Sequence, residues 1–371
     1  MPVSGTRNAK VRIMDTSALD LLKQLVALPT PSGWEADGMN LLARYVKPYA
    51  RQVAIDTHGN LRVSVNPRAK VRVMIDGHCD EIGFMVQYID EKGFLFLTAL
   101  GGVITQQLAG ERVVIQGRQG PVNGVFGVAP PHLLKPDEAK KVAPQELTDA
   151  CVDIGAASRE EAEKLVELGA PAVIDAGWRP LAGDRVACRG FDDRIGAFIV
   201  MEAVRRLHGK PLKVALHAVA SVQEELGLVG ATTATYDIQP HAGISVDVGF
   251  ASDCPRHEKK LVGDVSLGKG PILVCGPTYH PKMQALILEA ARSKAIPVQR
   301  QVRSRGAGTT AWPMRMVRSG AAVGLLSIPL RYMHSPVEVL SLGDVEQTIE
   351  LLVATLLAMP ANVNFRRPQP E

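Results

Sequence analysis

The stretch IDGHCDEIGFMV, residues 75–86, contains side chains that can bind a metal ion or titrate. It follows the apolar run VRVM (71–74), so a buried strand is expected to lead directly into His78, Cys79 and Asp80. Because side chains alternate along an extended chain, His78 and Asp80 point to one side of the strand and Cys79 to the other. A neutral imidazole with a carboxylate that orients it is a common metal-ligand arrangement. A polar turn, with His78 merely hydrogen-bonded, is the alternative interpretation.

Four further segments place carboxylates or a histidine at the end of a predicted strand or in a following loop. In open α/β sheets, ligands bind at the carboxyl ends of the strands. The groups are Asp192 and Asp193 in RGFDDRIGAF, Glu224 and Glu225 in ASVQEELGLVGA, Asp247 in ISVDVGFASD, and His334 in SIPLRYMHSPVEV. With His78 they supply two imidazoles and several carboxylates, which suit Zn²⁺, Co²⁺ or Mn²⁺.

Each of these segments also has a purely structural interpretation. The aspartate pair could cap a helix, the glutamate pair could be a solvated turn, and His334 could be an ordinary loop histidine. Asp247 is harder to explain in this way, because an unpaired carboxylate in an apolar strand is costly. The pair Glu224–Glu225 also suits catalysis, since one carboxylate can bind a metal while the other takes a proton from a metal-activated water.

Apolar runs and helical patterns indicate which elements position these groups. Strands are predicted at 71–76, 212–221, 243–248 and 324–328, and helices near 17–28, at 192–208 and at about 343–358. Near-continuous apolar strands separated by helices indicate an α/β domain with a mixed, largely parallel sheet flanked by helices.

From about residue 87 to 176 the pattern differs. Short strands such as GFLFLTA and ERVVIQG lie between close turn signals. Ser158 and Glu161 form a capping-box pattern before AEKLVEL, which predicts one helix. We therefore expect a small β-rich domain, 87–176, inserted into an α/β domain made of 1–86 and 177–371.

Composition limits the class of protein. The chain has 371 residues, 46% hydrophobic and 22% charged, which is ordinary for a soluble globular protein. No apolar run approaches the roughly 18 residues that span a bilayer, and the N-terminus lacks the apolar core of a secretory signal, so we expect a cytoplasmic protein without membrane contact. The arginine clusters have no interleaved aromatic residues, which argues against a nucleic-acid partner. The five cysteines include no CxxC and are expected to be reduced thiols.

The order of the motifs resembles the M42 family of dinuclear metallo-aminopeptidases, which includes the tetrahedral and glutamyl aminopeptidases. The motifs are HxDEIGFMV, FDDR, QEELGLVGA, VDV and SIPxRYxHSPVEV, and the resemblance extends over nearly the whole chain. It implies a zinc-peptidase-like catalytic domain and an inserted domain that is PDZ-like and serves in assembly. It also implies a homo-oligomer, commonly a dodecamer whose active sites face an interior chamber.

The resemblance further implies two divalent metal ions per subunit, with Zn²⁺ or Co²⁺ expected. The ligands would be His78 and Asp247 for one ion, Glu225 and His334 for the other, and Asp192 as the bridge. Asp80 would orient His78, and Glu224 would be the general base and later the proton donor to the leaving amine. The peptide bond after the bridging aspartate is often cis in related metallopeptidases.

The implied reaction is the removal of N-terminal residues from peptides with a free N-terminus, through a hydroxide held between the two ions. One position departs from the family pattern: the chain reads GTTA where GTDA is common, so Thr310 replaces an aspartate. The loss of a negative charge near the pocket argues against a preference for Lys or Arg and favours neutral or acidic N-terminal residues.

Other functions have less support from the sequence. A related dinuclear metallohydrolase, such as an N-acyl amino acid deacylase or a carboxypeptidase, would use a similar set of ligands. A glycoside hydrolase needs two carboxyl groups about 5–9.5 Å apart but leaves His78, His334 and Asp247 without a role. A metal-free scaffold does not explain why the expected ligands and the base are all present.

Overall fold

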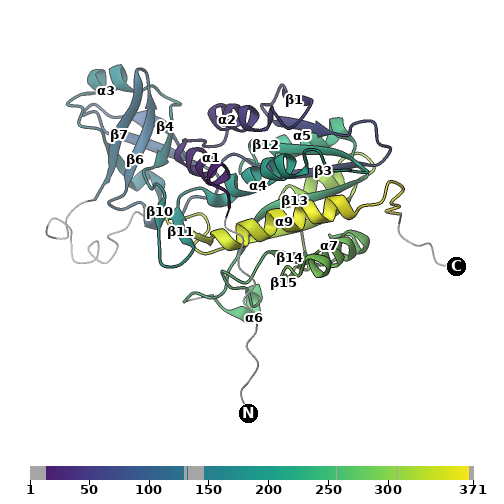
Figure 1. Cartoon of the computed structure of the whole chain (residues 1–371). Helices are drawn as coiled ribbons and strands as arrows, with labels where there is room; N and C mark the ends of the chain where they lie inside the picture. The colour runs from purple at the N-terminus through teal and green to yellow at the C-terminus, as the bar shows by residue number, and fades with distance from the viewer. Residues whose placement is uncertain (1–13, 129–131, 133–145, 256, 307, 367–371) are drawn as a thin grey trace, which may run out of the picture.

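The computed structural model describes residues 14–128, 132, 146–255, 257–306 and 308–366. Figure 1 shows an α/β domain with a β-rich unit at one end of it. The α/β domain is built on an eight-stranded sheet. In spatial order its strands are β1 (Gln52–Ile55), β2 (Leu61–Val65), β12 (Ala215–Ser221), β3 (Arg72–His78), β13 (Ala242–Phe250), β16 (Ala322–Leu330), β14 (Ile272–Cys275) and β15 (Gln299–Val302).

The central strands of this sheet are parallel. Strand β3 pairs in parallel with β12 and with β13, and β13 pairs in parallel with β16, whereas β2 and β14 join the central strands in antiparallel fashion. The mixed, largely parallel sheet predicted from the sequence is therefore confirmed. The register aligns His78 with Ser221 and Asp247 with Ser327, so the carboxyl ends of these four strands meet at one edge.

Helices cover both faces of the sheet. On one face lie α1 (Thr16–Ala27), α2 (Ala36–Val46), α4 (Phe191–Leu207), α7 (Pro281–Lys294) and α9 (Leu342–Ala358), which share the main hydrophobic core with the sheet (Figure 1). The other face is covered by α5 (Val229–Ile238) and α8 (Ala311–Met316), which pack in a second core. The short helix α6 (Lys259–Val262) precedes β14 in the chain. The helices predicted near 17–28, 192–208 and 343–358 correspond to α1, α4 and α9.

The β-rich unit is a closed six-stranded barrel with its own apolar core. Its strands, in order around the barrel, are β4 (Gly83–Ile89), β5 (Leu95–Leu100), β8 (Cys151–Asp153), β7 (Gly120–Gly127), β6 (Arg112–Gly117) and β9 (Pro171–Ile174). Helix α3 (Arg159–Leu165) follows Ser158, whose side chain accepts a hydrogen bond from the Glu161 N–H as the sequence predicts. A β-rich insert is thus present, while its PDZ-like character and the boundaries 87 and 176 stay predictions.

A small three-stranded sheet is formed by two strands that follow the barrel in the chain and a third that directly precedes α9. It consists of β10 (Arg179–Pro180), β11 (Arg185–Cys188) and β17 (Glu338–Ser341). Strand β11 leads directly into α4, and β17 leads into α9, so the sheet fixes the starts of two helices that cover the main sheet.

Helix α4 packs unusually close to the strand that carries His78. A Cβ atom on Gly77 would lie 2.3 Å from the carbonyl carbon of Gly196, which shows that only glycine permits this approach. The start of α4 is therefore held against the carboxyl end of β3, where the candidate metal ligands lie.

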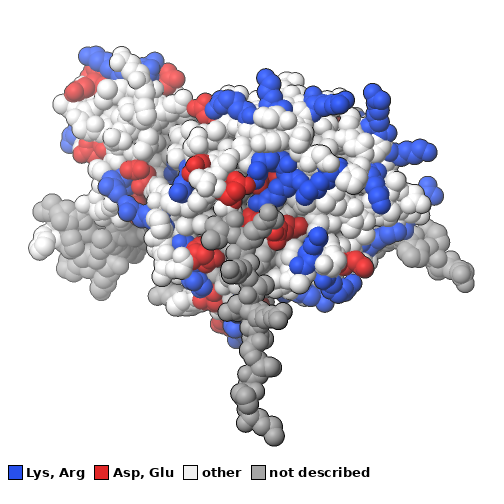
Figure 2. Space-filling view, in the orientation of Figure 1, with Lys and Arg blue, Asp and Glu red and all other residues white. Residues whose placement is uncertain are grey.

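The surface charge is uneven on the face seen in Figure 2. Lys and Arg side chains gather at the end of the α/β domain away from the barrel, whereas the barrel carries charges of both signs. Within the described part of the chain, no helix combines the length and the apolar character that crossing a membrane requires.

Candidate metal centre

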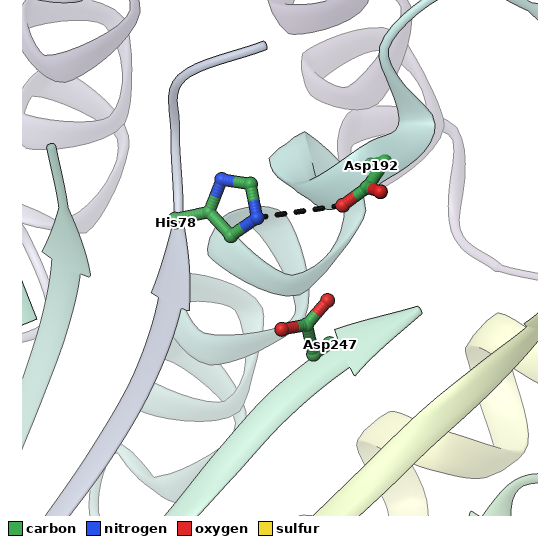
Figure 3. A group of neighbouring side chains, drawn as sticks. All are labelled: His78, Asp192 and Asp247. Atoms are coloured by element: carbon green, nitrogen blue, oxygen red, sulfur yellow. Dashed lines mark ion pairs between the residues drawn. The ribbon is translucent and has the colours of Figure 1, made fainter. Parts of the chain in front are cut away.

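His78 is the last residue of β3, and its ring is buried. Its Nδ1 atom lies 3.1 Å from the Asp80 carbonyl oxygen and 3.3 Å from Asp80 Oδ1. Two acceptors face Nδ1, so this nitrogen donates to Asp80, and Nε2 is the ring atom that a metal ion could bind. Nε2 points to Asp192 Oδ1 at 3.4 Å (Figure 3).

Asp80 also fixes the segment that carries the adjacent glutamates. Its Oδ1 accepts a hydrogen bond from the backbone N–H of Glu224 at 3.0 Å, and its Oδ2 accepts one from Glu225 at 3.1 Å. The Ser32 hydroxyl donates to Oδ2 at 2.6 Å. One buried carboxylate therefore orients both His78 and the start of the loop after β12.

Asp192 lies at the start of α4, between the two candidate histidines. Its Oδ1 faces His78, and its Oδ2 lies 3.2 Å from His334 Nε2. The Asp192–Asp193 peptide bond is cis, as the family resemblance implies. This central position is the one that a carboxylate bridging two ions would need.

His334 lies in the loop after β16 with a positive φ of 61°, a backbone conformation that non-glycine residues adopt at a cost. Its Nδ1 is 3.1 Å from the Gly102 carbonyl oxygen, which belongs to the insert. Its Nε2 is 3.2 Å from both Asp192 Oδ2 and Glu225 Oε1. The insert thus helps to orient one of the candidate ligands.

Asp247 reaches the same point from β13 (Figure 3). Potential ligand atoms of His78, Asp192 and Asp247 lie within 4.8 Å of one another, and so do those of Asp192, Glu225 and His334. The two trios share Asp192. A third such group joins His78 to Glu224 and Glu225. The structure therefore brings the five predicted ligands and the predicted base together, whereas their individual roles stay predictions.

The electrostatics of this cluster fit a divalent cation. The Nε2 atoms of His78 and His334 both face carboxylate oxygens, an arrangement that is favourable only if a proton or a metal ion lies between them. Hydrogen bonds to Asp192 and Glu225 raise the pKa of His334 to about 11. Burial, and then the carboxylates of Asp192 and Glu224, raise the pKa of Asp247 well above its usual range. Metal ions would relieve this repulsion, so the residues present are suited to hold them.

Glu224 is placed differently from the ligands. It is buried, and its Oε1 has no hydrogen-bond partner among the described residues. Burial raises its pKa to about 8, and the neighbouring carboxylates of Glu225 and Asp192 add to the shift. A carboxylate with a raised pKa and an unpaired oxygen can accept a proton from water near neutral pH.

Two further carboxylates support the cluster: Asp193, which the sequence singles out without assigning it a role, and Glu338, which was not predicted. Glu338 is buried, and its two oxygens accept the backbone N–H groups of His334 at 2.9 Å and Asp192 at 3.1 Å. Asp193 accepts from the backbone of His78 at 3.2 Å and Gly196 at 3.0 Å. Glu338 could have been predicted from the sequence, because burying an unpaired carboxylate in the apolar stretch VEVL costs free energy, as it does for Asp247 in its strand.

Thr310, where the family pattern has aspartate, lies outside the ligand cluster. It is buried, and its hydroxyl is 2.8 Å from the Ser245 hydroxyl. Its neighbour Thr309 lines a cavity of about 240 Å³ that opens from the cluster and is also lined by His78, Glu224 and Asp247. Substitution at position 310 therefore leaves the candidate ligands in place.

Comparison with known proteins gives consistent matches over most of the chain. Residues 59–351 match the model of the M42 glutamyl aminopeptidase family. The lysyl aminopeptidase of Pyrococcus furiosus is 38% identical, over 91% of this chain and 96% of its own length. The TET aminopeptidase of a marine sediment Thaumarchaeota archaeon superimposes with a TM-score of 0.87 at 35% identity, covering 93% of this chain and 98% of its own.

A further similar structure bears on assembly. The TET1 peptidase of Pyrococcus horikoshii, which can assemble into a tetrahedron or a large octahedral shell, superimposes with a TM-score of 0.82 at 32% identity. The match covers 92% of this chain and 100% of the TET1 chain. The similarity therefore includes the inserted unit as well as the α/β domain.

Proposed function

Because the chain belongs to the M42 family of aminopeptidases, we propose that it is a metal-dependent enzyme that removes N-terminal residues from peptides. The observation that carries this proposal is the convergence of two imidazoles and four carboxylates at one sheet edge. The two ligand trios, which share Asp192, support a centre for two ions.

The ligand assignment follows the two trios. His78 and Asp247 would hold one ion, Glu225 and His334 would hold the other, and Asp192 would be shared by both. Imidazole and carboxylate ligands favour Zn²⁺ or Co²⁺. When bound, such ions polarise the scissile carbonyl and lower the pKa of a water molecule.

Glu224 moves the protons of the reaction. Its unpaired Oε1 accepts a proton from the attacking water, and the same carboxyl group then donates it to the leaving amine. Asp80 keeps Glu224 in reach, because it holds the Glu224 backbone N–H at 3.0 Å. The proton therefore passes between groups that the fold holds in place.

The cluster also explains why a free N-terminus would be required. The α-ammonium group of a peptide is a cation, and the site is rich in carboxylates that can pair with it. Acetylation removes this charge and adds bulk at the point where the chain must end. We therefore propose an exopeptidase, with peptides bearing a free N-terminus as substrates.

The insert is proposed to serve assembly as a PDZ-like domain. The tetrahedral assembly of the similar TET1 peptidase supports a closed homo-oligomer, for which we propose a dodecamer with the active sites facing an interior chamber. Peptides that enter such a chamber would meet the sites, whereas folded proteins would be excluded.

The test compares leucine p-nitroanilide with its N-acetyl derivative and with N-acetyl-leucine. The protein is stripped of metal with a chelator and is then reloaded with Zn²⁺ or Co²⁺. We expect hydrolysis of the free-amine substrate only, lost on stripping and restored on reloading. Cleavage of N-acetyl-leucine instead would indicate a deacylase, and chelator-resistant hydrolysis would contradict the metal-dependent mechanism.

A further inference from the structure

The 240 Å³ cavity beside the metal centre is large enough to receive one side chain of the substrate. Its volume is below the about 300–1,000 Å³ of pockets that hold whole drug-sized ligands. We call it the side-chain pocket. Beyond the ligand cluster, the residues that line it include Val248, Phe250, Val274, Arg303, Thr309 and Leu325.

Arg303 provides a positive charge in this pocket. Its guanidinium lies 5.3 Å from the centre of the Phe250 ring, which also lines the pocket. No described carboxylate lies within ion-pair distance of Arg303, although other arginines of this domain, such as Arg331 with Asp253, are paired. The half-buried guanidinium therefore has no counter-ion among the described residues.

The rest of the pocket suits an acidic side chain with an aliphatic stem. Val248, Val274 and Leu325 supply apolar contacts, while Thr309 has a buried hydroxyl with no hydrogen-bond partner among the described residues. Apart from the ligand cluster and Glu224, the described residues that line the pocket include no carboxylate. A lysine or arginine side chain would meet Arg303 without a counter-charge.

We propose that Arg303 determines substrate specificity by binding the side-chain carboxylate of an N-terminal glutamate or aspartate. This inference rests on the proposed aminopeptidase function and specifies its substrate class. The Lys preference expressed in the name of the Pyrococcus furiosus relative would then not extend to this chain. The uncharged Thr310 agrees with a preference for acidic residues, since it adds no negative charge near the pocket.

The first arm of the test measures kcat/KM for p-nitroanilides of Glu, Asp, Gln, Leu and Lys. The leaving group is uncharged, so only the N-terminal residue can supply a carboxylate. We expect kcat/KM for the Glu or Asp substrate to exceed that for the Gln and Lys substrates by about 10- to 100-fold, as a charge-assisted hydrogen bond predicts. Arg303→Met should reduce the Glu/Leu ratio by a similar factor, and Arg303→Glu should shift the preference to Lys.

The matched control is Arg305→Met. Arg305 is exposed, lies two residues from Arg303 and does not line the pocket, so the Glu/Leu ratio should stay within about threefold. A binding measurement complements the kinetics. We expect free L-glutamate to raise the Tm of the metal-loaded protein more than L-lysine does, and this difference should disappear in Arg303→Met.

A second arm identifies which carboxylate Arg303 binds, since the C-terminal carboxylate of a dipeptide has the same chemistry. If Leu-Leu and Leu-Leu-amide respond equally to Arg303→Met, the side-chain assignment is supported; a selective loss for Leu-Leu overturns it. The inference is also overturned if the wild-type protein cleaves Leu p-nitroanilide in a metal-dependent way and its kcat/KM for the Lys substrate equals or exceeds that for the Glu substrate. The aminopeptidase proposal stays intact in that case. Failure to cleave any free-amine substrate overturns the proposed function itself.

Discussion

At the residue scale, Glu224 differs from the neighbouring carboxylates because its buried Oε1 has no hydrogen-bond partner among the described residues. We predict that Glu224→Gln lowers kcat by about 10²–10⁴-fold, the usual contribution of a positioned general base. The amide keeps the shape of the side chain, so the metal content should not change. Steady-state kinetics together with elemental analysis of the purified protein tests this. A loss below tenfold with both ions bound would exclude Glu224 as the base.

Glu338 acts on the ligands through their backbones. Its two oxygens each accept one N–H, from His334 and from Asp192, and glutamine can accept only one of these bonds. We predict that Glu338→Gln weakens metal binding by about 10- to 100-fold, as removal of groups that orient ligands does. Metal titration of the stripped protein measures the effect. The control is Glu289→Gln, whose side chain is 76% exposed; equal affinities in the two variants would contradict a positioning role.

The composition of the site could be predicted from sequence at this scale, but its contacts could not. His78, Asp192 and Asp247 could be identified because polar groups end apolar strands or start a helix. The contact between His334 and the Gly102 carbonyl could not, because it joins residues 232 positions apart in the chain and involves a backbone atom of the insert. The role proposed for Arg303 could not be predicted from the sequence, since it depends on the absence of a nearby carboxylate among the residues that the structure describes.

At the scale of elements, the packing of α4 against β3 and β13 positions the ligands. A Cβ on Gly196 would lie 2.1 Å from Asp193 Oδ2 and 2.5 Å from the Val246 carbonyl oxygen. We predict that Gly196→Ala destabilises the protein by about 1–3 kcal/mol and lowers metal occupancy, because α4 must move away from β13, the strand that carries Asp247. Urea unfolding and elemental analysis measure both effects.

Gly177→Ala is the matched control for this substitution. A Cβ at Gly177 meets no heavy atom within 4 Å, and its φ is not in the positive range. Its effect on stability should be within about 0.5 kcal/mol. If Gly196→Ala behaves like Gly177→Ala, the close approach of the helix is not needed to form the site.

The four central strands and three of the helices of the α/β domain could be predicted, because each is a long run of one pattern, whereas short strands such as β1, β14 and β15 were not predicted. The stretch VRVMID became β3 and GLLSI became part of β16. The order of the barrel strands could not be predicted, because β4 pairs with both β5 and the distant β9. Short strands have alternatives of similar energy, and only packing of the whole barrel core selects among them.

At the scale of the whole molecule, one edge of the main sheet is exposed. Strand β15 is an edge strand, and Val302 at its end is 77% exposed. Leu261 of α6 is 75% exposed, and the Gln301 side chain holds α6 near β15 through a hydrogen bond of 2.5 Å to the Val262 carbonyl oxygen. An exposed edge strand with apolar side chains favours pairing with another chain.

We predict that this edge is buried between subunits of a closed assembly. A dodecamer of the 39.9 kDa chain would have a mass of about 480 kDa, which light scattering after size exclusion distinguishes from a dimer. Leu261→Ser with Val302→Ser should reduce that mass, because the substitutions remove apolar area from the contact while leaving the ligand cluster unchanged. A wild-type protein that is monomeric at micromolar concentration would contradict the assembly. An unchanged mass in the double variant would instead place the subunit contact on another surface.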